Sequence, residues 1–210
     1  MYETERADLV EAGRRLAEGG LVVGTAGNLS VRAGEHVVVT ASGTDLGTLT
    51  PELLTVVDRT GRVVDGDPRP TSELPLHLAI YARTDATAVA HAHAMSSIAV
   101  GCTHDVLPPV HYATLQLGGV VRVAPYATFG STQLADNVVT ALAGRGAALM
   151  RNHGSVALGE TVAAACARVE LVEWLAETYR RAVALGRPRL LTDEELAAAA
   201  EQFTNLEYGR

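Results

Sequence analysis

The stretch VAHAHAMSS, residues 89–97, places His91 and His93 two positions apart in an apolar run. Residues i and i+2 of a β-strand project from the same face, so the two imidazoles are expected side by side, with Cα atoms roughly 6–7 Å apart. Two buried polar rings each need a partner. The pair alone leaves two explanations open: core histidines that bond to backbone carbonyls, or two ligands of one metal ion.

A third histidine, His153, follows the apolar run AALM and precedes Gly154, where we expect a tight turn. Three histidines from two strands are the usual ligands of an open catalytic zinc site, whose fourth position is left for water or substrate. His77 lies four residues after Glu73 on one face of an expected helix. That spacing makes His77 either a further ligand or a hydrogen-bond partner of the site.

Glu73 follows the segment RPTS, where we expect a helix to begin. A carboxylate in the first turn of a helix complements the helix dipole, and this structural role is the simplest explanation. Beside a bound metal, a carboxylate at this position would also be suited to act as a base.

Three short loops carry neutral hydrogen-bond donors: GTAGNLS, TASGTD and RPTSE. Each loop on its own is typical of an ordinary turn or helix cap. Together, their backbone N–H and hydroxyl groups would be able to hold a phosphate without a lysine. The residues concerned are Gly27, Asn28, Ser42, Gly43, Thr71 and Ser72.

The chain contains no lysine, since all 17 basic residues are arginine. No side chain can therefore form a Schiff base with a carbonyl substrate or with pyridoxal phosphate. A Walker-type phosphate loop is excluded as well, because it needs its lysine. Any reaction that leaves an electron pair on carbon would need a different electron sink.

The composition is that of an ordinary globular domain: 210 residues, 48% hydrophobic and 20% charged. The net charge of −7, without a basic cluster, argues against nucleic acid and anionic membranes as partners. No apolar run approaches the roughly 18–20 residues of a membrane span. The start, MYETERADLVEAGRR, lacks the apolar core of a signal peptide, and two cysteines are too few for a disulfide framework. We expect a cytoplasmic protein with reduced thiols.

Periodicity and capping signals predict alternating helices and strands. Helices are expected over residues 4–18, 72–84, 95–102, 131–143 and 161–185, and a last helix opens with a capping box at Thr192 and Glu195. Strands are expected over residues 29–32 and 36–40, after the helical turn at Pro51, over 87–94, and on both sides of Gly154. The stretch DRTGRVVDGDPRP is turn-rich and is expected at the surface. The pattern predicts a single α/β domain over residues 1–210.

The ordered segments GNLS, TASGTDLGTLTPE, TSELPLHLAIY, AHAHAMSS, LPPVHYATLQLGG and MRNHGSVALGET resemble the class II aldolase/adducin family. The resemblance covers about residues 5–185. It implies a three-layer fold, with a central, mainly antiparallel β-sheet flanked by helices. It also implies a mobile C-terminal tail from about residue 190, and homotetramers whose sites lie at subunit interfaces.

The resemblance implies a role for each candidate residue. His91, His93 and His153 would bind a catalytic Zn²⁺, with Mn²⁺, Co²⁺ or Mg²⁺ as alternatives. Glu73 would be the acid/base at the substrate carbon, and would also bind the metal when substrate is absent. Tyr112 would reach a neighbouring subunit's site and handle the proton on the aldehyde oxygen, and Tyr208 would close over the substrate. The substrate phosphate would be held by Gly27, Asn28, Ser42, Gly43, Thr71 and Ser72.

The activity implied is cleavage of a 1-phosphoketose, L-fuculose 1-phosphate first among them, through a metal-stabilised enediolate. The products would be dihydroxyacetone phosphate and a short aldehyde, L-lactaldehyde. A metal as electron sink agrees with the absence of lysine. Thr71 and Ala41 stand where the family often has Ser and Pro, which leaves the exact substrate open.

Several alternatives remain. Within the family they are a 5-deoxyribulose-1-phosphate aldolase, a methylthioribulose-1-phosphate dehydratase and a ribulose-5-phosphate 4-epimerase. In a different class, a non-catalytic adducin-like scaffold would lack the metal histidines that this chain has. A metallohydrolase would continue as HxHxDH, whereas Met95 and Ser96 follow here.

Overall fold

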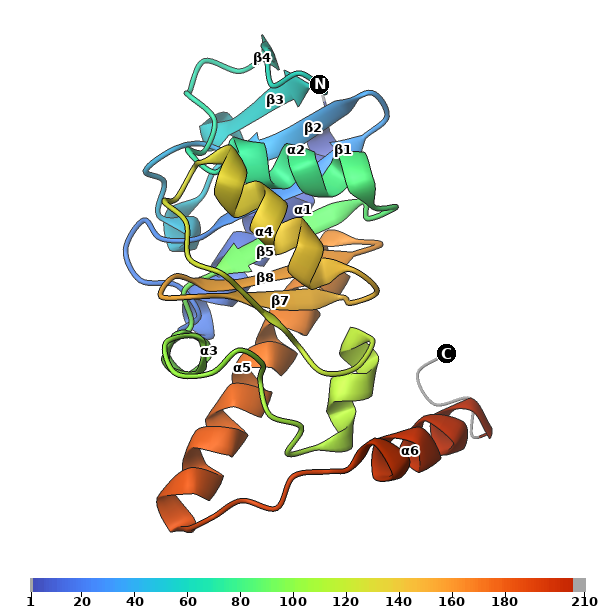
Figure 1. The fold of residues 1–210 in the computed structure, drawn as a ribbon. Helices are drawn as coiled ribbons and strands as arrows, with labels where there is room; N and C mark the ends of the chain where they lie inside the picture. Colours follow the sequence, from blue (N-terminus) through green and yellow to red (C-terminus); the bar gives the residue numbers. More distant parts are fainter. Residues whose placement is uncertain (1, 206–210) are drawn as a thin grey trace.

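The computed structural model describes residues 2–205, which form one eight-stranded sheet with helices on both faces (Figure 1). The strand order is β4-β3-β2-β1-β5-β8-β7-β6. Every pairing is antiparallel except that of β6 with β7. The strands are β1 (Asn28–Ala33), β2 (His36–Thr40), β3 (Leu54–Asp58), β4 (Val63–Asp65), β5 (Ala88–Ala92), β6 (Val123–Ala124), β7 (Ala147–Met150) and β8 (Gly154–Gly159).

Five helices cover the sheet, and two apolar cores lie between them and its faces. On one face, α2 (Leu74–Arg83) packs beside α4 (Thr132–Leu142) (Figure 1). The other face is covered by α1 (Glu3–Glu18), α3 (Met95–Gly101) and α5 (Val162–Leu185). The predicted three-layer fold with a mainly antiparallel sheet is confirmed.

Polar side chains cap the starts of three helices, and the capping box at Thr192 and Glu195 is the one that the sequence predicts. Ser131 accepts a hydrogen bond from the backbone N–H three residues on at 3.2 Å, and Thr161 does the same at 3.1 Å. Thr192 and Glu195 form a reciprocal capping box, with distances of 2.8 and 3.2 Å. Such caps satisfy N–H groups that have no partner inside the helix.

One short strand was not predicted, and one turn lies beside its expected position. The turn-rich stretch after Asp58 contains β4, an edge strand whose Val63 is 44% exposed, so neither face of it carries a buried apolar pattern. The turn expected at Gly154 is formed instead by residues 151–153, with Asn152 in the left-handed region (φ 55°). Gly154 begins β8, where a Cβ would collide with the carbonyl oxygen of Ala92.

The chain after α5 leaves the sheet. Its helix α6 (Asp193–Asn205) extends away from the body beside the 3-10 helix η3 (Tyr112–Leu117) (Figure 1). The predicted mobile tail thus includes a helix, and its last residues, Tyr208 among them, lie outside the described residues. Within residues 2–205, none of the helices combines the length and the apolar character needed to cross a bilayer.

Candidate active site

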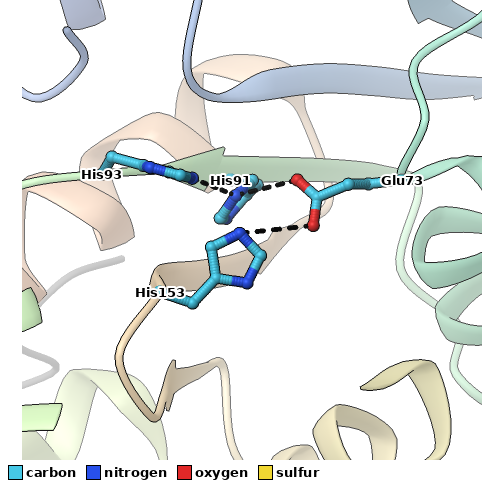
Figure 2. Close-up of side chains that lie close together, drawn as sticks. All are labelled: Glu73, His91, His93 and His153. Atoms are coloured by element: carbon cyan, nitrogen blue, oxygen red, sulfur yellow. Dashed lines mark hydrogen bonds and ion pairs between the residues drawn. The ribbon is translucent and has the colours of Figure 1, made fainter. Parts of the chain in front are cut away.

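Four side chains converge where β5 ends and α2 begins (Figure 2). His91 lies in β5, His93 one residue beyond its end, and His153 in the turn between β7 and β8. Glu73 occupies the N-cap position of α2. The ring centroids of the three histidines are 4.8–4.9 Å apart, and one ligand atom from each of the four residues lies within 4.8 Å of the others.

The hydrogen bonds of His91 define which of its nitrogens faces this cluster. Its Nδ1 lies 2.8 Å from the carbonyl oxygen of Ser155, and a carbonyl only accepts, so Nδ1 carries the proton. In the neutral ring, Nε2 then presents a lone pair 2.9 Å from Nε2 of His93. Two ring nitrogens facing each other need a proton or a cation between them.

The Glu73 carboxylate completes the cluster with both oxygens. Its Oε2 lies 3.0 Å from Nε2 of His91 and accepts a hydrogen bond from Nδ2 of Asn28 at 2.9 Å. Its Oε1 lies 3.4 Å from Nε2 of His153, and it is buried without a hydrogen-bond partner among the described residues. A buried carboxylate oxygen that faces imidazole nitrogens and lacks a donor is suited to a cation.

The electrostatics of the cluster favour the metal-binding protonation state at Glu73, His93 and His153. Burial raises the pKa of Glu73, but the attraction of His91, the hydrogen bond with it, His153 and the Asn28 amide outweigh burial and hold that pKa well below its usual range. Burial and the neighbouring histidines lower the pKa of His93 to about 4, and burial and His91 lower the pKa of His153. His91 differs: the lowering effect of burial on its pKa is outweighed by Glu73 and by the hydrogen bond with Ser155, so its pKa is raised and a metal ion would have to displace a proton from its Nε2. An ionised carboxylate and neutral imidazoles are the forms that coordinate metal ions.

The donor set fits a divalent metal ion. Three imidazole nitrogens and one carboxylate oxygen from four residues suit zinc and its neighbours in the first transition series better than calcium. The chain therefore contains a histidine and glutamate cluster able to bind a metal.

A cavity of about 300 Å³ opens beside this cluster. Glu73, His93 and His153 line one side of it, while His91 is fully buried behind them. The positive φ angles of Gly27 (88°) and Gly43 (75°) let two of the loops turn toward the cavity. All six residues expected to hold phosphate also line it: Gly27, Asn28, Ser42, Gly43, Thr71 and Ser72.

Tyr112, one of the two candidate tyrosines, does not line this cavity. Tyr112 begins η3, is 49% exposed and stacks on His111 with a centroid distance of 4.3 Å. Tyr208 lies outside the described residues.

Two residues that line the cavity were not predicted from the sequence, and the role of a third residue nearby was left open. Tyr126 and Phe129, in the loop between β6 and α4, line the cavity although they are 62% and 65% exposed. The Pro- and Gly-containing stretch APYATFGS is typical of a loop, and its two aromatic residues were the signal that could have marked them. His77 is not part of the ligand cluster, because its Nε2 lies 2.5 Å from Oδ1 of Asn28 instead.

Comparison with known proteins agrees with this arrangement. Residues 7–180 match the family model described as the class II aldolase and adducin N-terminal domain. The chain belongs to the class II aldolase and adducin family.

Relatives in this aldolase family carry more than one substrate name. The chain is 38% identical over 200 residues to a 5-methylthioribulose-1-phosphate/5-deoxyribulose-1-phosphate aldolase of Rhodospirillum rubrum, covering 94% of this chain and 90% of the relative. It is 37% identical over 187 residues to the L-fuculose phosphate aldolase of Escherichia coli strain K12, covering 88% and 86%. A solved structure named L-fuculose 1-phosphate aldolase superposes with a TM-score of 0.91 at 38% identity, covering 96% of this chain and 97% of that one.

Proposed function

We propose that this protein is a metal-dependent aldolase that cleaves a 1-phosphoketose to dihydroxyacetone phosphate and a short aldehyde. L-Fuculose 1-phosphate, which would give L-lactaldehyde, is the first substrate to test. One observation carries the proposal: the Glu73 carboxylate meets three imidazoles at the side of a cavity that six phosphate-binding candidates also line.

His91, His93 and His153 would hold the metal ion, and Glu73 would join them when substrate is absent. We propose Zn²⁺, with Mn²⁺, Co²⁺ or Mg²⁺ as alternatives. When bound, the ion supplies Lewis-acid polarisation of the substrate carbonyl, which is the electron sink that a chain without lysine needs.

Glu73 would act on the substrate carbon. The phosphate, held by Gly27, Asn28, Ser42, Gly43, Thr71 and Ser72, would fix the reacting carbons near this carboxyl group. As the carbon–carbon bond breaks, a base takes the proton from the adjacent hydroxyl group. The electron pair of that O–H bond then forms the aldehyde carbonyl. The electrons of the broken bond would give an enediolate. Glu73, which is ionised in the free site, would take up a proton from solvent and pass it to this carbon, while the base releases the hydroxyl proton to solvent, so that one proton is lost and one is gained.

Tyr112 of a neighbouring subunit would be that base, and Tyr208 would close over the bound substrate. The exposed position of Tyr112, outside its own chain's cavity, supports a shared site. We therefore propose a homotetramer with sites at subunit interfaces. Both cysteines are free thiols, which supports the proposed cytoplasmic location.

A second substrate class has specific support. The Rhodospirillum rubrum relative is named for 5-methylthioribulose 1-phosphate and 5-deoxyribulose 1-phosphate, whose sugar ends are less polar than that of L-fuculose 1-phosphate. Tyr126 and Phe129 give the cavity an aromatic side that an apolar sugar end would contact. Dehydratase and epimerase chemistry remain the alternatives at the same four residues, and the intact histidine set argues against a non-catalytic scaffold.

The test is an assay of purified protein against all three 1-phosphoketoses. Dihydroxyacetone phosphate is detected with a coupled dehydrogenase, before and after EDTA treatment and again with zinc or manganese restored. We expect metal-dependent release, with the relative kcat/KM values ranking the sugar ends. If protein with one metal per chain releases no dihydroxyacetone phosphate from any of them, the aldolase proposal is wrong.

A further inference from the structure

A row of buried polar side chains leads from Glu73 away from the cavity. Nδ2 of Asn28 donates to Glu73 at 2.9 Å, and Oδ1 of Asn28 lies 2.5 Å from Nε2 of His77. Nδ1 of His77 lies 2.7 Å from the hydroxyl of Ser30, which lies 2.7 Å from the hydroxyl of Tyr81. The row joins β1 to α2.

The direction of each hydrogen bond follows from the chemistry of its ends. The ionised Glu73 carboxylate only accepts, so the amide nitrogen of Asn28 faces it and the amide oxygen faces His77. That oxygen only accepts, so Nε2 of His77 donates and its Nδ1 must accept. Ser30 therefore donates to His77, and Tyr81 donates to Ser30.

Burial keeps the row in this single arrangement. Ser30 and His77 are completely buried, and Asn28 is 5% exposed. Burial lowers the pKa of His77 to about 4, so the ring is neutral and one of its nitrogens is free to accept. Burial raises the pKa of Tyr81, whose hydroxyl therefore keeps the proton that it donates.

We propose that His77 is a positioning residue, which locks the Asn28 amide with its NH₂ group toward Glu73 and so holds the carboxylate against the three histidines. If the amide rotated by half a turn, its oxygen would face a carboxylate oxygen at hydrogen-bond distance, and two acceptors would repel each other. Locked as it is, Nδ2 keeps a second hydrogen for a substrate anion in the cavity that Asn28 lines. The inference rests on the proposed function in so far as Glu73 acts on substrate.

The test compares variants that remove or keep the donor at position 77. His77→Phe has an aromatic ring of similar size but no N–H group, whereas His77→Gln keeps a donor. Ile80→Ala, in the same helix and fully buried, is a matched control for loss of stability, because the Ile80 side chain takes no part in the hydrogen bonds of the row. For each variant we would measure kcat, KM, melting temperature, and metal affinity by competition with a chromophoric chelator.

We expect His77→Phe to lower both kcat and metal affinity; the loss of about 10–100-fold that is usual for a direct partner of a metal-binding residue, here Asn28, is the upper limit. His77→Gln should restore most of both, and Ile80→Ala should lower the melting temperature alone. Two results would overturn the lock. The first is that His77→Phe loses activity but keeps its metal affinity; the second is that Ile80→Ala loses as much activity and metal affinity as His77→Phe does.

A double-mutant cycle with Asn28→Ala then shows whether His77 acts through Asn28. If it does, adding His77→Phe to Asn28→Ala changes kcat little further; additive losses would contradict the lock. Should His77→Phe fail to fold, Ser30→Ala tests the same row, because it removes the donor that fixes the His77 tautomer. We expect Ser30→Ala to weaken metal binding as well. Unchanged metal affinity would contradict the proposal that this row of hydrogen bonds holds Glu73 in place.

These measurements separate two failures. If the wild-type protein lacks aldolase activity, the proposed function is wrong. The metal affinities of His77→Phe, His77→Gln and wild type still test the lock in that case, since they need no substrate.

Discussion

The Nδ1 atom of His91 donates to the backbone carbonyl oxygen of Ser155, 2.8 Å away across the β5–β8 pair. The acceptor belongs to the sheet itself, since Ala92 pairs with Ser155 and His91 pairs with Val156. The register of two central strands thus fixes the tautomer and orientation of a buried imidazole. Such a bond on the outer nitrogen commonly orients a histidine toward a metal ion.

Removal of the metal should therefore inactivate and destabilise the protein. A ligand present at about 1,000 times its Kd stabilises the folded state by about 4 kcal/mol, so EDTA should lower the melting temperature and added zinc should restore it. Calorimetry with and without EDTA measures this. His91→Ala is the control, because its melting temperature should not respond to EDTA; an equal response would place the metal elsewhere.

Glu73→Gln should keep the metal on the three histidines and lose the proton transfer. We expect kcat to fall by about 10²–10⁴-fold, the range of general acid–base catalysis. Steady-state kinetics and metal analysis of the same preparation check this. Glu52→Gln, an exposed change of the same kind, should be fully active. Full activity of Glu73→Gln with metal bound would remove Glu73 from the mechanism.

Much of the fold could be predicted because local signals and the tertiary structure agree. Capping residues such as Ser131 and Thr161 mark helix starts, and the apolar runs of β5 and β7 mark central strands. The edge strand β4 could not be predicted, because Val63 is exposed and its pairing with β3 includes a register shift.

The candidate site, like the fold, could be predicted only in part. The spacing of His91 and His93 indicated that both rings could bind one metal ion, and the structure brings both rings close to Glu73 and His153. The hydrogen bond that the Asn28 side chain donates to Glu73 could not be predicted from the sequence. It depends on the antiparallel pairing of β1 with β5, which places Asn28 opposite His91.

Gly154→Ala should displace the backbone and two of the histidine rings of the metal-binding cluster. A Cβ at this position would collide with the Ala92 carbonyl and would lie 3.2 Å from ring atoms of both His91 and His93. Overpacking of this kind typically costs about 1–3 kcal/mol, and moving the two rings should also weaken metal binding. Gly146→Ala is the matched control, because its Cβ would make contacts of 3.4 Å or more. Denaturant unfolding and chelator competition on both variants test this; equal effects would contradict it.

The metal-free protein should lose stability as the pH falls from about 6.5 to about 4. The pKa of His77 is lowered from 6.5 to about 4 in the folded state, so the unfolded chain binds a proton that the folded chain does not. At pH 4 the loss from His77 approaches about 3 kcal/mol. Urea unfolding of wild type and His77→Gln in EDTA at several pH values isolates this contribution. We expect the difference between them to shrink as the pH falls; a constant difference would exclude His77 as its source.

Tyr112 should complement Glu73 between subunits if the site is shared. In a mixed oligomer, a site formed by Tyr112 from a Glu73→Gln chain and Glu73 from a Tyr112→Phe chain is complete, although each variant alone is impaired. Co-refolding the two variants with different tags, and purifying the mixed species on both tags, should recover a fraction of wild-type kcat. The control is a mixture of each variant with itself, which should stay impaired. If mixed oligomers form and activity does not return, Tyr112 does not act on a neighbouring chain's site.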